Sequence, residues 1–254
     1  MLTALTRTIS PAIARCELTH VAREPIDVDR AVAQHEEYQR TLAALGCRVH
    51  RLPAGPELPD AVFIEDTAVV FDELAVITRP GAEARRAETA EVAEALTDYR
   101  RLVTIQPPGT LDGGDVLLVD NTIFVGQSSR SNAAGASQLH QLMEPYGYTV
   151  NRVEVSGCLH LKSAVTQVAE GMLLINPGWV RPGAFGELKT IEVDPTEPFG
   201  ANAVRIGKAV VYPAGFPKTR RRLEAQGIDV RTVDASELAK AEGGVTCCSL
   251  IFHS

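Results

Sequence analysis

Hydrophobic residues along this chain recur with two spacings, which alternate from one end of the sequence to the other. Where they lie three or four positions apart, they predict helices that each bury one face. Such stretches run over Asp27–Leu45, Glu83–Tyr99, Ser131–Tyr146 and Pro217–Gly227, with shorter ones near Ala184 and after Asp234. Asp27 and Pro217 favour helix starts, and Gly46 and Gly227 favour helix ends. The runs between the helices are rich in branched aliphatic residues, which indicates strands and therefore an α/β protein.

The predicted elements follow one order several times. Two strand segments precede a helix and a third follows it, over residues 63–107, 113–155, 160–194 and 200–234. The tail GGVTCCSLIF begins a fifth unit, and its missing helix and last strand are available at the other end as Asp27–Leu45 and CRVHRLP. Five strand–strand–helix–strand units predict a closed ring in one domain over residues 1–254, and the alternative is an ordinary α/β sheet.

Composition narrows the class of partner. The formal net charge is -7, which argues against a nucleic-acid partner. No run approaches the roughly 18 apolar residues of a membrane helix, and the first 20 residues lack the apolar core of a signal peptide. A cytoplasmic location without membrane contact is therefore expected. In that compartment the five scattered cysteines are expected to be packed or reactive thiols, not disulfides.

Each unit opens with a polar or reactive residue in a similar place. These residues are Asp66, Asp112, His160, Asn202 and Cys247, at intervals of 46, 48, 42 and 45 residues. Equivalent positions in a ring of like units meet at its axis, so we expect these side chains to share one cavity. A cysteine with a histidine and a carboxylate is typical of nucleophilic catalysis, in which the histidine moves protons and the carboxylate orients it.

Of the two adjacent cysteines, only one is expected to face this cavity. If both lie in a strand, their side chains point to opposite faces. Gly243 and Gly244 leave room for a ligand just before Cys247, so Cys247 is predicted to face the cavity and Cys248 to pack away from it.

Charged residues in the first units suggest what the cavity binds. The run LPDAVFIED holds Asp60, Glu65 and Asp66, which would suit a cationic substrate or could form a solvated acidic loop. Arg85 and Arg130 are candidates for a substrate carboxylate, or surface arginines. A zinc site of Cys247, His160 and Asp112 is a further alternative, although these residues form no compact ligand motif.

Segments spread over nearly the whole chain resemble the dimethylarginine dimethylaminohydrolase family of the guanidine-modifying superfamily. They read LPDAVFIEDTAV, AVITRPGAEARR, GTLDGGDVL, FVGQSSRSN, CLHLKS, GANAV and AEGGVTCCS. The resemblance implies a five-bladed α/β propeller that hydrolyses Nω-methylated arginine to citrulline and methylamine or dimethylamine. It also implies a covalent S-alkylthiouronium intermediate on a cysteine.

The resemblance further implies roles for individual residues. Cys247 would be the nucleophile, His160 the general acid and base, and Asp112 its acidic partner. Substrate contacts would come from Leu18 on a mobile lid, Asp60, Glu65, Asp66, Arg85, Arg130 and the backbone near Ala241. The chain departs from the compared members at KAEGG, where Ala241 and Glu242 replace a larger β-branched residue and an aspartate.

The positive charge of such a substrate would help to ionise the thiol, so no metal or organic cofactor is expected, and zinc at the Cys247 site would act as an inhibitor. The partner would be a small methylated arginine, and the protein a monomer or homodimer. Two other functions remain open from the sequence: a related hydrolase of the arginine deiminase kind, and a non-catalytic propeller that binds a partner.

Overall fold

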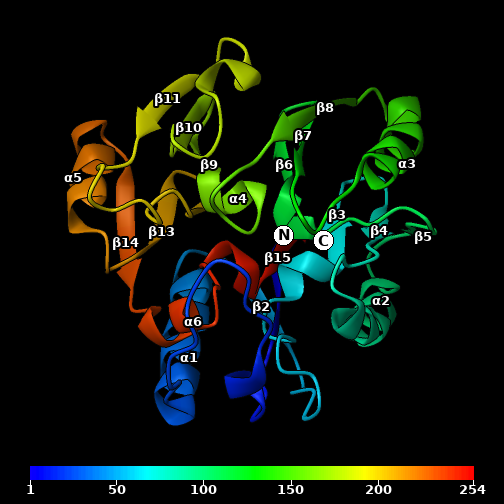
Figure 1. The fold of residues 1–254 in the computed structure, drawn as a ribbon, viewed down its shortest axis with the longest axis horizontal. Coiled ribbons are helices and arrows are strands. Elements are labelled where there is room, and N and C mark those ends of the chain that lie inside the picture. Colours follow the sequence, from blue (N-terminus) through cyan, green and yellow to red (C-terminus); the bar gives the residue numbers. More distant parts are fainter.

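The structure is a computed structural model that describes all residues from 1 to 254, and it contains five three-stranded sheets (Figure 1). In each sheet the central strand pairs antiparallel with one neighbour and parallel with the other. The first two sheets are β3 (Ala68–Val70), β4 (Ala75–Ile77) and β5 (Leu102–Thr104), and β6 (Val116–Val119), β7 (Thr122–Gln127) and β8 (Thr149–Glu154). The next two are β9 (Val165–Ala169), β10 (Met172–Ile175) and β11 (Lys189–Glu192), and β12 (Val204–Ile206), β13 (Ala209–Pro213) and β14 (Asp229–Val233). The predicted α/β class and its five repeating units are confirmed.

The fifth sheet joins the two ends of the chain. Its strands are β15 (Leu250–His253), β1 (Leu2–Arg7) and β2 (Arg48–Leu52), with β1 in the centre. Figure 1 shows the two termini close together near the middle of the view. The sequence analysis assigned no strand to the first residues, because β1 is buried along nearly all its length and does not alternate between polar and apolar positions.

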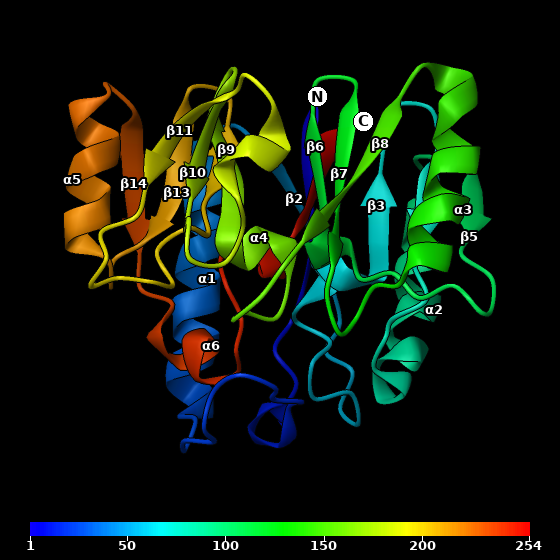
Figure 2. The same cartoon turned by 45° about the horizontal axis from the view of Figure 1, so that its top comes forward.

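Crossover helices connect the parallel strands, since a parallel pair cannot be joined by a tight turn. They are α1 (Val28–Ala44), α2 (Thr89–Leu96), α3 (Ala133–Met143) and α5 (Pro217–Ala225), while the third unit has only the 3-10 helix η6 (Pro182–Phe185). The predicted caps form: Asp27 accepts the Arg30 N–H, and Gly46 follows α1 with φ 94°. In Figures 1 and 2, α3 and α5 lie at opposite edges of the molecule, outside the sheets.

Each helix buries its apolar face against a neighbouring sheet. In α3, for example, Ala136, Leu139 and Met143 pack against Ile123 and Val125 of β7. The predicted helix over Glu83–Tyr99 is shorter than expected, because its first part is the 3-10 helix η3 (Glu83–Glu88) and α2 begins only at Thr89. The short helix α6 (Ser236–Lys240) lies beside α1, and Glu237 accepts the Asp27 N–H across the contact.

The openings of the units differ from the strands predicted there. Four of the five openings form one-turn helices: η2 (Ile64–Thr67), η4 (Gly113–Asp115), α4 (Leu161–Ala164) and η7 (Thr246–Cys248). Their backbone bonds reach three residues along the chain, as from the Asp66 N–H to the Phe63 carbonyl and from the Asp115 N–H to the Asp112 carbonyl. Local bonds of this kind replace the sheet ladder, so the strands begin three to seven residues later than predicted.

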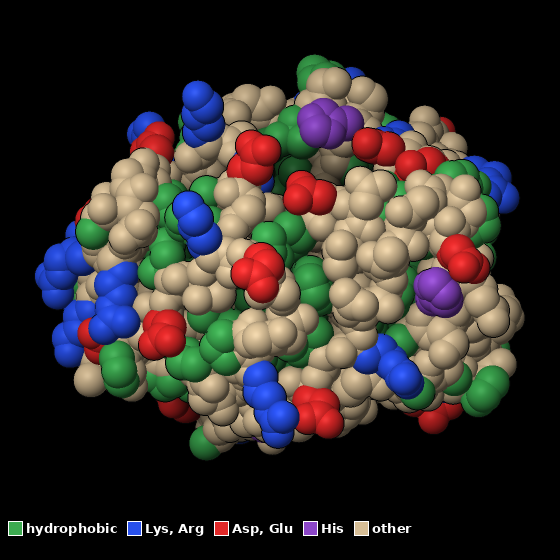
Figure 3. All heavy atoms as spheres, turned by 90° about the horizontal axis from the view of Figure 1, so that it is seen from above, with side chains coloured by type: hydrophobic (Ala, Val, Ile, Leu, Met, Phe, Trp, Pro, Cys, Tyr) green, Lys and Arg blue, Asp and Glu red, His purple; other side chains and the backbone are tan.

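On the face drawn in Figure 3, acidic and basic side chains are mixed, and basic ones gather toward its left edge, on the side of α5. None of the helices combines the length and the apolar character that crossing a membrane would require.

Candidate active site

The one-turn helices bring the polar residues of different units to one small cavity. Its volume of about 10 Å³ gives room for about a single water molecule. His160 and Cys247 line it together with the following residues: Glu17, Asp60, Phe63, Asp66, Arg85, Arg130, Leu159, Ala241, Glu242 and Gly243. Of the residues singled out from the sequence, Leu18, Glu65, Asp112 and Asn202 lie beside or behind this cavity.

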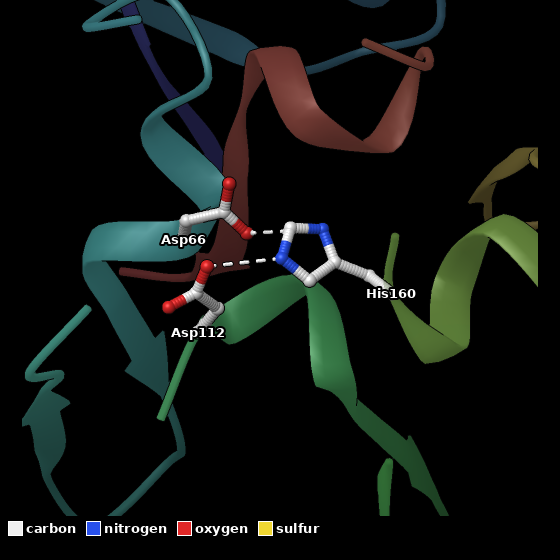
Figure 4. Close-up of side chains that lie close together, drawn as sticks. All are labelled: Asp66, Asp112 and His160. Carbon is white, nitrogen blue, oxygen red and sulfur yellow. Dashed lines mark hydrogen bonds and ion pairs between the residues drawn. The ribbon is translucent and has the colours of Figure 1, made fainter. Parts of the chain in front are cut away.

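His160 is held between two carboxylates. Its Nε2 lies 2.9 Å from Asp112 Oδ2 and its Nδ1 lies 3.8 Å from Asp66 Oδ1, and all three side chains are buried (Figure 4). The other Asp112 oxygen accepts the Gly81 N–H at 2.8 Å, which fixes the carboxylate. Burial lowers the pKa of His160, but Asp66 and the hydrogen bond to Asp112 outweigh it and raise the pKa to about 9. The imidazole is therefore protonated at neutral pH.

Asp66 stays ionised because two cations face it. Its Oδ2 accepts from Arg85 Nη1 at 2.6 Å and its Oδ1 accepts the Gly114 N–H at 2.9 Å. Burial raises the pKa of Asp66, but His160 and Arg85 outweigh burial and lower it to about 2. The cavity thus contains a fixed negative charge next to a protonated imidazole.

Cys247 is the only cysteine with a partly exposed side chain, and its Sγ accepts the Gly244 N–H at 3.3 Å. Burial, and then the nearby Glu65 and Asp66, raise its pKa to about 12, so the thiol is protonated at neutral pH. Cys248 is buried in the apolar cluster around α1. The predicted strand at this point is wrong, because both cysteines lie in η7. Successive residues of a 3-10 helix point about 120° apart, so the two side chains still face different surroundings.

Glu65 lies beneath the cavity and connects three of the one-turn helices. Its Oε1 pairs with Lys162 Nζ at 2.6 Å, and its Oε2 accepts the Thr246 hydroxyl at 2.7 Å. Asn202 accepts the Thr246 N–H and donates to the Thr246 Oγ1 and the Lys162 carbonyl. This network holds η2, α4 and η7 in one arrangement and thereby positions Cys247.

The two arginines differ in how strongly they are bound. Both are buried, with 4% and 8% exposure for Arg85 and Arg130, so neither is a surface arginine. Arg85 donates to Asp66 and Glu88 as well as to the Asp60 and Phe63 carbonyls. The Arg130 guanidinium donates only to the Thr19 hydroxyl, at 3.1 Å. Arg130 therefore keeps donors free for a ligand, whereas Arg85 is largely committed to protein carboxylates.

The N-terminal segment closes the cavity from above. Asp60 accepts the Glu17 N–H with both oxygens, at 3.1 and 3.3 Å. Leu18 is half-buried against the apolar cluster around α1, and Ala241 is buried where α6 ends. The segment thus contacts Asp60 and Arg130, two of the residues that the resemblance assigns to substrate contacts.

Sequence reasoning missed Asp115, the second aspartate of TLDGGD. It is buried and accepts the Ser131 hydroxyl at 2.6 Å and the Leu161 N–H at 2.9 Å. Burial, partly offset by His160, raises its pKa to about 6. Asp115 therefore ties the loop that carries Arg130 to the turn that follows His160. The only available signal was its position in the same motif as Asp112.

One group of side chains could hold a metal ion. Ligand atoms of Asp66, Asp112 and His160 lie within 4.8 Å of one another, and Cys247 is not part of this group. The cluster differs from the zinc site considered above, in which Cys247 took the place of Asp66. A metal bound to Nε2 of His160 would have to displace the hydrogen bond to Asp112, because a ligand imidazole must be deprotonated at that nitrogen.

Known proteins are similar to this chain over most of its length. A family model described as "N,N dimethylarginine dimethylhydrolase, eukaryotic" matches residues 19–182. N(G),N(G)-dimethylarginine dimethylaminohydrolase of Streptomyces coelicolor is 42% identical, over 97% of this chain and 95% of the relative. The protein of the same name from Pseudomonas aeruginosa is 35% identical, over 89% of this chain and 90% of the relative.

Solved structures are equally similar. A cysteine-to-serine variant of the P. aeruginosa enzyme, complexed with citrulline, superposes with a TM-score of 0.95 at 33% identity, over 99% of this chain and 100% of the other. A histidine-to-glycine variant of a dimethylarginine dimethylaminohydrolase, as an adduct with S-methyl-L-thiocitrulline, gives a TM-score of 0.94 at 33% identity with the same coverage.

The fold and these similarities define an enzyme of the guanidine-modifying superfamily. Within that superfamily, the chain belongs to the dimethylarginine dimethylaminohydrolase family.

Proposed function

We propose that this chain hydrolyses Nω-methylated arginine, both dimethylarginine and monomethylarginine, to citrulline and dimethylamine or methylamine. The observation that carries the proposal is a partly exposed thiol, Cys247, in one cavity with a protonated histidine and the ionised Asp66. A planar guanidinium cation complements such a site, because carboxylates can bind its N–H groups in pairs. The two relatives named above are called dimethylarginine dimethylaminohydrolases, and this chain matches each of them over 90% or more of the relative's length.

In the first half-reaction the substrate itself activates the nucleophile. The acids around Cys247 keep its thiol protonated, and a bound guanidinium would offset their charge and lower the thiol pKa. The thiol releases its proton to solvent, and the thiolate then forms a bond to the guanidinium carbon. His160, which carries a proton at neutral pH, gives it to the departing methylamine or dimethylamine as the C–N bond breaks. An S-alkylthiouronium remains on Cys247.

In the second half-reaction the neutral His160 takes a proton from water. The hydroxide equivalent bonds to the thiouronium carbon, the C–S bond breaks, and citrulline leaves as the hydroxyl proton passes to the departing Cys247 sulfur and restores the thiol. Asp112 would bind His160 at Nε2 throughout, so Nδ1 is the nitrogen left to exchange protons with the substrate side. This assigns proton transfer to His160 and orientation to Asp112.

The amino-acid end of the substrate would lie under the N-terminal segment. We assign its carboxylate to Arg130, which has free donors, and leave Arg85 chiefly to hold Asp66 in place. Asp60 would accept from the α-amino group, Glu65 would support Cys247 from below, and Leu18 and the Ala241 backbone would cover the ligand. No metal or organic cofactor takes part, and zinc bound at Cys247 would inhibit.

We also propose that the five sheets close into a five-bladed propeller and form a single domain. The pairing of β1 with β15 supports closure, because it joins the last unit to the first residues of the chain. Methylated arginine in the cytosol would be the substrate, and the oligomeric state stays a prediction of monomer or homodimer.

Incubation of the purified protein with dimethylarginine, monomethylarginine and arginine tests the function. We expect citrulline with dimethylamine or methylamine from the first two, detected by mass spectrometry. Citrulline with ammonia from arginine alone would instead indicate a deiminase. Binding of the ligands without any citrulline would indicate a non-catalytic protein and would overturn the proposal.

A further inference from the structure

The N-terminal segment that covers the cavity must move for a substrate to bind. We call residues 16–24 the lid segment; it contains neither helix nor strand. The cavity beneath it has about the volume of one water molecule, far less than an arginine derivative requires. Arg23 closes the base of the segment by donating to the Ala14 and Cys16 carbonyls, both at 2.6 Å. The part that can lift is therefore the exposed stretch between Cys16 and Arg23.

Three side chains from the rest of the molecule hold that stretch down. Asp60 accepts the Glu17 N–H, Arg130 donates to the Thr19 hydroxyl, and Glu242 accepts two adjacent backbone N–H groups. The Glu242 bonds run from the Thr19 N–H to Oε2 at 2.7 Å and from the His20 N–H to Oε1 at 2.9 Å. Both are charge-assisted, and Glu242 is the only one of the three side chains that binds two backbone N–H groups of the lid segment.

The three contacts differ in what a substrate would do to them. Asp60 and Arg130 are the side chains assigned above to the amino and carboxylate groups of the substrate, so a ligand competes with the lid for both. Glu242 is assigned to no substrate group, and its two bonds can persist while the ligand is bound. It is therefore the one contact able to hold the lid shut over an occupied cavity.

The backbone at Glu242 is unusual in a way that serves this contact. Glu242 has φ 60°, and Asp120 is the only other non-glycine residue with a positive φ. This left-handed conformation is unfavourable for a residue with a side chain, and such strain concentrates at functional positions. It occurs between α6 and the Gly243–Gly244 pair, where Gly243 packs so closely on Phe63 that a Cβ would meet the ring at 2.1 Å.

We infer that Glu242 is a positioning residue for the reaction: it latches the lid segment closed over bound substrate. This inference rests on the proposed function for its kinetic consequence, but not for the latch itself. If only the closed lid completes the binding site, the apparent dissociation constant equals the intrinsic one divided by the closed fraction. Loss of the latch lowers the closed fraction, so it weakens substrate capture more than it slows the chemical steps.

The test compares Glu242→Gln with Glu24→Gln. Glu24 and Glu242 both line a second cavity, next to the active-site cavity, so each change removes one negative charge from it. Of the two side chains, only Glu242 accepts hydrogen bonds from the lid backbone. Hydrogen–deuterium exchange of the peptide over residues 17–24 reports the lid directly. We expect the Thr19 and His20 amides to exchange at least about tenfold faster in Glu242→Gln and at the wild-type rate in Glu24→Gln.

Kinetics on dimethylarginine give the second readout. We expect kcat/KM to fall about tenfold in Glu242→Gln, with kcat within about threefold of wild type, and Glu24→Gln to match wild type. His20→Pro removes one of the two donors from the lid side, and it should speed exchange at Thr19 even if the Glu242 variant folds poorly.

The possible results test the latch, its role in substrate capture and the proposed function separately. Unchanged exchange in both Glu242→Gln and His20→Pro would overturn the latch, whatever the kinetics. Faster exchange with unchanged kcat/KM would overturn its role in capture. If the wild-type protein converts none of the guanidines, the proposed function fails, and the exchange experiment still decides whether Glu242 holds the lid.

Discussion

At the scale of single residues, the site is defined by which groups are charged before the substrate arrives. His160 is protonated, Asp66 is ionised, and Cys247 is a neutral thiol whose pKa of about 12 lies far above neutral pH. A cysteine enzyme that relied on its own histidine alone would need the opposite order of pKa values. In the proposed mechanism the incoming cation is required to form the thiolate, which confines the reactive thiolate to the moment when a guanidinium is bound.

The two adjacent cysteines should differ in function. Cys247→Ser should abolish citrulline formation, because a serine hydroxyl is far harder to ionise than a thiol. Cys248→Ser should keep most of the activity, since Cys248 packs in the apolar cluster around α1. Citrulline assays on both variants check this. An inactive Cys248→Ser that still folds, beside an active Cys247→Ser, would reverse the assignment.

The raised pKa of His160 should make the free energy of unfolding depend on pH. A histidine whose folded pKa is about 9 stabilises the fold fully below its unfolded value of about 6.5, and this contribution is lost as the pH rises through 9. The interval between the two values corresponds to about 3 kcal/mol. We expect the gap in unfolding free energy between wild type and His160→Gln to shrink by about that amount from pH 6 to pH 10.

Urea unfolding of both proteins across this range makes the measurement, and titrating groups remote from His160 cancel in the difference. A gap that stays constant with pH would mean that His160 is neutral in the folded protein. The proposed proton donation to the leaving amine would then lose its basis.

At the scale of elements, the sequence predicted the helices well and the site turns poorly. The 3.6-residue period and the caps Asp27 and Gly46 define α1 to within a residue or two. By contrast, FIED, LDGGD, HLKS and VTCC contain the same branched and apolar residues as strands. Only their polar side chains, which bond to neighbouring turns in place of a sheet partner, make them one-turn helices. Those bonds connect residues 46, 48 and 181 positions apart, so no local pattern reports them.

The arginines can be separated by what each one connects. Arg85 in η3 binds Asp66 of η2 and also Glu88, and its removal leaves the buried Glu88 without a side-chain partner and Asp66 without one of its two cations, and breaking a buried ion pair typically costs about 3–5 kcal/mol. Arg85→Ala should therefore lose stability and lose activity on every substrate. Arg130→Ala should fold normally and raise KM for dimethylarginine about tenfold or more, by loss of a charge-assisted hydrogen bond.

A methylguanidine without a carboxylate supplies the control. Because that compound has no group for Arg130 to bind, its kcat/KM should change far less in Arg130→Ala than that of dimethylarginine. Equal losses on both compounds would show that Arg130 supports the structure and that the carboxylate is bound elsewhere.

At the scale of the whole molecule, the repeat is what the sequence reveals most clearly. An even spacing separates Asp66, Asp112, His160, Asn202 and Cys247. It predicted that these side chains lie close together, and this prediction did not depend on the bounds of any strand. In the structure Asp66, His160 and Cys247 line one cavity, while Asp112 bonds to His160 and Asn202 bonds to Thr246, the residue before Cys247. Glu242 could not be predicted in the same way, because it belongs to no repeat. Its contact to the lid joins residues more than 220 positions apart.

If the five sheets close into a ring, the chain can begin at another position along the ring and still form all five sheets. Met1 and Ser254 already bond to each other, with the Met1 amine donating to the Ser254 carbonyl at 3.0 Å and the Ser254 N–H to the Met1 carbonyl at 2.8 Å. A permuted chain with these ends joined by a short glycine–serine linker, and opened in the exposed hairpin between Gly207 and Lys208, should fold and keep citrulline formation within about threefold.

Deletion of residues 250–254 removes β15 with its buried Leu250 and Phe252, beside Cys247. Loss of two such side chains costs several kcal/mol, a large part of a typical stability of about 5–15 kcal/mol. Urea unfolding and citrulline assays on both chains make the comparison. A truncated chain as stable and active as the full one would show that β15 does not close the fifth sheet, and an unfolded permutant would show that the order of the units matters beyond their pairing.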